Sequence, residues 1–158
     1  MGIESYFFTI ILHGQLSETE VKSFFQGGCE VKPYSMSAGK LFKRRIIDKE
    51  RFVIDNKAIV RIYTSAEGIN VNFELCFSNY ASKVVYIFDI AKKLCLLGDS
   101  ARLILPNCNL DFSLVDLDNF KQILQKSYKD KRLSFRNKYG NINVDILPHE
   151  FYSYIRKH

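Results

Sequence analysis

The sequence predicts a single α+β domain, residues 1–158, with three or four helices on a largely antiparallel sheet. Three observations lead to this fold class. Residues 69–77 alternate between apolar and polar side chains, the period-two pattern of a strand with one exposed face. Two segments with apolar residues at three- and four-residue steps end at glycine, as amphipathic helices do. Strand segments also follow one another without an intervening helix, which favours α+β over a parallel α/β fold.

The beginning of the chain predicts a strand followed by a capped helix. Residues 4–12 are aromatic and β-branched, as in a strand that is buried on both faces. Ser17 and Glu20 match a capping box, in which the serine hydroxyl accepts from the Glu20 amide and the Glu20 carboxylate reaches back. A Gly-Gly pair then ends the helix.

The next segments predict strands joined by short turns. Residues 30–36 form a candidate strand, and Pro33 places it at a sheet edge because proline has no N–H to donate. Residues 51–54 and 58–64 are strands around an Asp-Asn-Lys turn, whose residue types tolerate turn geometry. Together with the alternating segment described above, they make three consecutive antiparallel strands.

The second half of the chain predicts further helices and two short strands. Ser78 is expected to cap a helix that closes near Gly98, and residues 102–105 form a strand that Pro106 halts. Asp116 is expected to cap a long helix that extends to about Arg136.

The last segments are a strand and a short helix. Residues 142–146 alternate as a strand would, and residues 150–156 form a helix after Pro148. The complete order of elements permits a ferredoxin-like core with additions.

The formal charge of +6 is concentrated in two basic blocks. Residues 40–61 carry a local net charge of +5 and residues 121–138 one of +6, so the rest of the chain is acidic. Such blocks attract acidic proteins and neutralise phosphates, and neighbouring aromatic rings can stack on bases. The candidate binding residues are Lys43, Arg44, Arg45, Lys131, Arg132, Arg136 and Lys138. The candidate stacking residues are Phe42, Tyr128, Phe135 and Tyr139.

The basic blocks also have a simpler interpretation as solvated surface. Lysine is a common residue on the outer face of a helix that has one apolar stripe. We expect two blocks that share one face to indicate a phosphate ligand, and two blocks that diverge to indicate solvated surface.

Motifs for catalysis and metal binding are absent from the sequence. It contains no P-loop, dinucleotide-binding glycine motif, nucleophile elbow or zinc-protease helix, and no cofactor is expected. His13, at the end of the first strand, is the remaining candidate for an enzyme site. The cysteines are spaced too widely for zinc and have apolar neighbours, so we expect reduced thiols without metal. They are Cys29, Cys76, Cys95 and Cys108.

These observations predict a non-enzymatic binding module of a soluble, cytoplasmic protein of bacterial or phage type. Its partner is a macromolecule, and an acidic protein or a nucleic acid fits the charge. A nucleic-acid-binding protein that uses both basic blocks is the alternative, and a small enzyme with a site near His13 is the second alternative. No membrane contact is expected, because the apolar stretch at residues 6–12 is far shorter than a membrane span.

Overall fold

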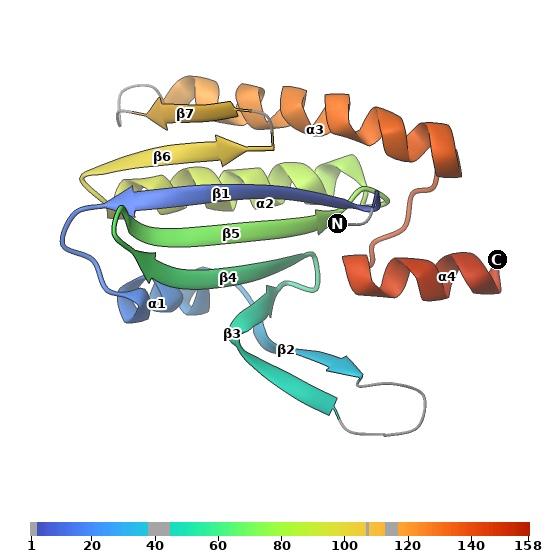
Figure 1. Ribbon diagram of the computed structural model, residues 1–158, viewed down its shortest axis with the longest axis horizontal. Helices are drawn as coiled ribbons and strands as arrows, with labels where there is room; N and C mark the ends of the chain where they lie inside the picture. The colour runs from blue at the N-terminus through green and yellow to red at the C-terminus, as the bar shows by residue number, and fades with distance from the viewer. Residues whose placement is uncertain (1–2, 38–44, 107, 113–116) are drawn as a thin grey trace.

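Seven strands form one antiparallel sheet in the order β2-β3-β4-β5-β1-β6-β7 (Figure 1). This arrangement comes from a computed structural model, which describes residues 3–37, 45–106, 108–112 and 117–158. The strands are β1 (Ser5–His13), β2 (Val31–Ser37), β3 (Arg45–Ile54), β4 (Ala58–Ser65), β5 (Gly68–Cys76), β6 (Ser100–Leu105) and β7 (Cys108–Phe112). The predicted α+β fold with an antiparallel sheet is confirmed.

The helices α1 and α2 lie behind the sheet in the view of Figure 1, and α3 packs against α2. The helices are α1 (Glu18–Gly28), α2 (Ala81–Leu94), α3 (Leu117–Tyr139) and α4 (Phe151–Lys157), with 3-10 turns η1 (Cys95–Leu97) and η3 (Pro148–Glu150). Helix α2 connects β5 to β6, and β1 lies between these two strands. This order is compatible with a ferredoxin-like core, which stays a prediction.

The core lies between the sheet and the helices, and alternate residues of β1 point into it. Tyr6, Phe8 and Ile10 are buried, whereas Phe7 and Thr9 between them are only partly covered. This is the consequence of the two-residue side-chain period of a strand. The ring of Phe8 stacks on Phe73 of β5 at a centroid distance of 4.7 Å and meets Phe88 of α2 edge-on at 5.8 Å.

Several local predictions are confirmed by hydrogen bonds and backbone angles. The Ser17 hydroxyl accepts from the Glu20 N–H at 3.2 Å, and the Glu20 carboxylate accepts from the Ser17 N–H at 2.8 Å. Asp55 and Asn56 adopt positive φ angles of 49° and 53° in the turn between β3 and β4. Strand β2, which contains Pro33, is at a sheet edge as predicted.

Two local predictions are wrong. Ser78 does not cap α2, because its buried hydroxyl donates to the Val144 carbonyl at 2.9 Å and α2 begins without a side-chain cap. Residues 142–146 are not a strand. They run alongside the β5–α2 loop, where the Val144 N–H donates to the Ser78 carbonyl at 2.8 Å and the Ile146 N–H donates to the Asn79 side chain. The predicted Asp116 cap lies outside the described residues.

Strand β7 was not predicted from the sequence. It pairs with β6 from Leu105↔Cys108 to Ala101↔Phe112 and forms the second edge of the sheet.

Candidate interaction surface

The described parts of the two basic blocks lie on different sides of the molecule. The first block includes parts of β3 and β4, and the second block lies on α3. In Figure 1, β3 and α3 are on opposite sides of the central strands. Of the candidate residues in the first block, Arg45 is the first residue of β3, and Lys43 and Arg44 lie outside the described residues. In the part that the structure describes, the two blocks therefore diverge.

Helix α3 has an apolar face toward the core and a basic face toward solvent. Its buried residues are Leu117, Phe120, Leu124, Tyr128 and Phe135. On the opposite face, the cations Lys126, Lys129 and Arg136 are exposed, and none of them has an ion-pair partner among the described residues. Leu133 lies among them with 58% of its surface exposed. We call these four residues the outer face of α3.

Arg132 points inward from the same helix. Its Nε donates to the Phe77 carbonyl at 2.9 Å, and its Nη2 donates to the side-chain oxygen of Asn143 at 2.9 Å. The guanidinium thus joins α3 to the end of β5 and to the segment that precedes η3. These bonds occupy donors that a phosphate would use, so Arg132 is a fold-stabilising residue as well as a candidate for binding.

The other predicted cations of α3 are in different surroundings. Lys138 is exposed, and its Nζ lies 5.1 Å from the centroid of the Tyr139 ring. Lys131 is half-buried and lines a pocket next to β1. Lys121, which also belongs to the basic block, is paired with Asp89 of α2 at 2.6 Å.

The aromatic residues near the second basic block are not available for stacking on bases. Tyr128 and Phe135 are buried in the core. Tyr139 is partly covered and packs edge-on against Phe151 of α4 at 4.9 Å. Phe42, the remaining candidate, lies outside the described residues. The described part of the chain therefore gives the basic helix no adjacent stacking platform of the kind that single-strand binders use.

A second polar site lies on the sheet face opposite the helices, and it was not predicted from the sequence. Arg51 of β3 and Arg61 of β4 are direct cross-strand partners and line a pocket of about 390 Å³ with Asn72 and Glu74 of β5. Arg61 donates to Glu50 at 2.6 Å. Like charges directly opposite each other destabilise a sheet unless they are compensated. The ion pair with Glu50 compensates Arg61, and with Glu74 also lining the pocket the two carboxylates equal the two arginines in number. Only the strand alternation of β4 and β5 could have indicated that these side chains share a face.

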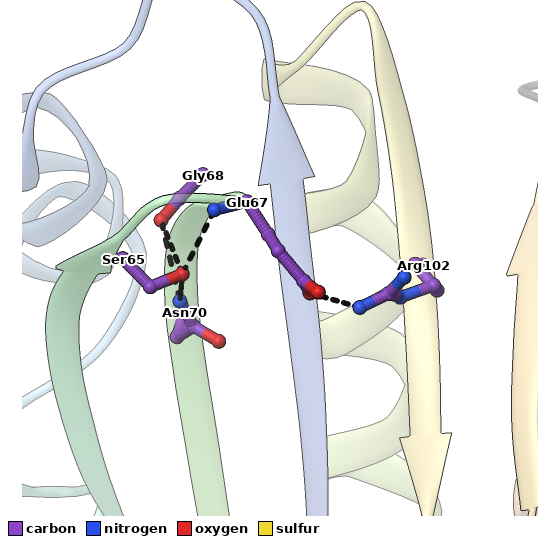
Figure 2. Close-up of polar contacts among 5 residues, drawn as sticks. All are labelled: Ser65, Glu67, Gly68, Asn70 and Arg102. Atoms are coloured by element: carbon purple, nitrogen blue, oxygen red, sulfur yellow. Dashed lines mark hydrogen bonds and ion pairs between the residues drawn. The ribbon is translucent and has the colours of Figure 1, made fainter.

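A polar network closes one end of this sheet face (Figure 2). The Ser65 hydroxyl accepts from the Glu67 N–H at 3.2 Å and from the Asn70 side chain at 2.7 Å. Figure 2 shows the Glu67 side chain extending across β1 to Arg102 of β6, with which it forms an ion pair. Ile11 of β1 is directly opposite Asn70 of β5 and Arg102 of β6 in the strand register, and it is only 2% exposed. The network thus has a structural role, since it covers an apolar residue on the sheet face that the helices leave open.

Glu74 in the polar pocket is expected to reduce stability at neutral pH. Burial raises its pKa, and Glu4 acts in the same direction, although the Ser5 hydroxyl and Arg51 oppose them. The native state therefore holds the proton more tightly than the unfolded state, and stability falls as pH rises above about 4, the ordinary glutamate pKa. Glu74→Gln should raise the free energy of unfolding at pH 7 and leave it almost unchanged below pH 4. Urea denaturation at both pH values measures this difference, and an equal effect at both would contradict the assignment.

His13 lacks the surroundings of a catalytic residue. It is partly exposed at the end of β1, and none of the described residues lies within hydrogen-bond distance of its ring nitrogens. A general base is normally oriented by such a partner. The second alternative, an enzyme site near His13, gains no support from this geometry.

The described cysteines are unpaired thiols with raised pKa values. Burial raises the pKa of Cys95 to about 12, and burial with the nearby Asp55 raises that of Cys29 to about 11. Cys76 is buried and lies 3.1 Å from the Ser78 hydroxyl. Since the thiolate is the reactive form, these thiols are poor nucleophiles at neutral pH. In the described residues, no group of three or more His, Cys, Asp or Glu side chains is placed to hold a metal ion.

Within the described ranges, no helix has both the length and the apolar character to cross a membrane. In comparisons with known proteins, no family model, no curated protein and no solved structure matches this chain.

Proposed function

We propose that this protein is a non-enzymatic binding module whose partner is an acidic protein. The observation that carries the proposal is the outer face of α3, where Lys129 and Arg136 lie one helical turn on either side of the exposed Leu133 and Lys126 lies one turn farther away. Cations without intramolecular partners favour association with an acidic surface. An exposed leucine among them adds an apolar contact that a phosphate backbone would not use.

The alternative of a nucleic-acid-binding protein has less support. The described parts of the two basic blocks diverge, and Tyr128 and Phe135 are buried in the core. Arg132 is already hydrogen-bonded within the fold. A nucleic acid would therefore contact α3 through a few lysine and arginine side chains alone. The cytoplasmic location stays a prediction.

The proposal predicts that an acidic amphipathic peptide binds to α3 more tightly than DNA does. We expect Lys129→Gln/Arg136→Gln to weaken binding of a labelled glutamate- and leucine-rich peptide at least tenfold. Loss of two charge-assisted contacts of about 1 kcal/mol each is sufficient for this effect. Adding Leu133→Ser should weaken peptide binding further, and this additional loss of affinity should depend little on the salt concentration. Fluorescence anisotropy with the peptide, a labelled single strand and a labelled duplex measures the three affinities.

A matched variant separates the outer face of α3 from net charge. Lys22→Gln/Lys93→Gln removes two exposed cations from other elements and should leave peptide binding within about twofold of the original protein. Tight binding of DNA at low salt, with log K falling by about 3 or more per decade of salt and no effect of Leu133→Ser, would instead establish the nucleic-acid alternative. Equal weakening by the two double variants would contradict a specific surface on α3.

A further inference from the structure

The first residues of β1 pair with a strand on one side only. Strand β5 pairs with β1 from Ser5 onward. On the other side, pairing with β6 begins at Thr9, which is opposite Ile104. Strand β6 ends at Leu105, and Pro106 follows. Figure 1 shows β6 ending well short of the N-terminal end of β1. Leu105, the last residue of β6, lies beside Phe8 in the continued register, and no strand of the described residues lies beside residues 5–7.

The main-chain groups of Ser5 and Phe7 point toward this space. Neighbouring residues of a strand direct their N–H and C=O groups to opposite sides. The Glu4 carbonyl accepts from the Phe77 N–H on the β5 side at 2.8 Å, and the His13 carbonyl accepts on the β6 side. Because the pairing of β1 with β5 has no bulge, every second residue from His13 back to Ser5 faces the β6 side. Ser5 and Phe7 thus present an open strand edge.

A pocket of about 410 Å³ lies along the same edge. Phe7 and Phe8, from opposite faces of β1, both line it, together with Leu105 at the end of β6. Lys131 and Ser134 of α3 form the opposite wall. The pocket therefore continues the line of β6 between β1 and α3, and apolar side chains dominate it. Lys131 is the only charged side chain among its described lining residues.

We propose that this groove binds an extended, mainly apolar segment of a partner protein, which pairs with residues 5–7 of β1 in line with β6. Strand addition of this kind gains affinity from main-chain hydrogen bonds and specificity from pockets for alternate side chains. At about 3.3 Å per residue, the edge accommodates roughly three residues of a guest strand. The groove is separate from the outer face of α3. Binding in the groove is therefore independent of the function proposed for that face.

A copy of the chain's own β5 is a suitable probe for this edge. In the protein, residues 69–75 of β5 form antiparallel pairs with β1 on its other side, so a synthetic peptide of this sequence is suited to pair with the same strand. In the free protein, we expect the amide protons of Tyr6 and Phe8 to exchange slowly and those of Ser5 and Phe7 to exchange fast. The peptide at about millimolar concentration should slow exchange at Ser5 and Phe7 at least tenfold. Hydrogen exchange followed by NMR measures each amide separately.

Three controls decide between strand addition and other modes of binding. The same peptide with an N-methyl group at every residue cannot donate from either edge, and it should give no protection at Ser5 and Phe7. Ser134→Trp, which fills the groove from α3, should abolish protection, whereas Gln122→Trp at an exposed site elsewhere on α3 should not. Lys129→Gln/Arg136→Gln should also leave the protection intact, so failure here is distinct from failure of the proposed function.

Unchanged exchange at Ser5 and Phe7 with the peptide present would overturn the proposal. Equal effects of the N-methylated and unmodified peptides would also overturn it, because the groove would then bind apolar side chains without pairing to β1.

Discussion

Phe8→Ala is expected to lower the free energy of unfolding by about 3–5 kcal/mol, the range for removal of a buried phenylalanine from a core. Phe8 is 2% exposed in β1, an interior strand of the sheet that lies between β5 and β6. Its ring stacks on Phe73 with an interplanar angle of 4° and contacts Phe88 of α2 edge-on. Truncation removes contacts with both the sheet and a helix, and the pairing of β1 with β5 at this position limits relaxation of the backbone around the cavity.

Phe7→Ala is the matched control, because it makes the same chemical change one residue earlier. Phe7 points to the sheet face that the helices leave open and is only partly covered. Its truncation should therefore lower the free energy of unfolding clearly less than Phe8→Ala does. Urea denaturation of both variants and the original protein measures the two decreases in the free energy of unfolding. The comparison requires equal m-values for the three proteins. Equal losses would contradict the assignment of the two faces of β1.

The parts of the fold that were predicted correctly depend on short-range signals. The Ser17 capping box is satisfied within four residues of chain, and the side-chain alternation of β5 follows from the geometry of a single strand. The edge position of β2 also follows from one residue, Pro33, which cannot donate to a second neighbour. Such features need no knowledge of the rest of the molecule.

The errors arise where a distant segment supplies the partner. Residues 142–146 have strand-like alternation, yet their main-chain groups bond to Ser78 and Asn79, more than 60 positions earlier in the chain. The Ser78 hydroxyl donates to the carbonyl of Val144, another residue of this distant segment, instead of capping α2. A periodic pattern shows which face of a segment is apolar but not which element will cover it.

The candidate surface was predicted only in part. The basic character of α3 is evident in the sequence, but its division into exposed and inward-pointing cations is not. Arg132 bonds to a carbonyl 55 positions away, whereas Arg136, one helical turn later, is exposed. The open edge of β1 was also inaccessible to sequence reasoning, because it results from the relative lengths and register of β1 and β6.

Gly68→Ala is expected to destabilise the protein by roughly 2–4 kcal/mol, because two effects act together. Gly68 has a φ of +143°, a backbone conformation that L side chains rarely adopt. An added Cβ would also overlap the main-chain oxygen of Leu12 in the adjacent β1. That atom belongs to an interior strand and cannot move without disturbing the β1–β5 pairing. The strand would therefore have to shift, or the turn between β4 and β5 would have to open.

Gly27→Ala is the opposite case and should stabilise the protein by about 0.5–1 kcal/mol, since alanine favours a helix over glycine by this amount. Gly27 is near the end of α1, and an added Cβ would have no neighbour within 4 Å. The midpoints of thermal and urea denaturation should therefore be lower for Gly68→Ala and higher for Gly27→Ala than for the original protein. A Gly68→Ala variant as stable as the original would contradict the turn conformation and the close approach of β5 to Leu12. Destabilisation by Gly27→Ala would mean that the end of α1 contacts a part of the molecule that leaves no room for a methyl group.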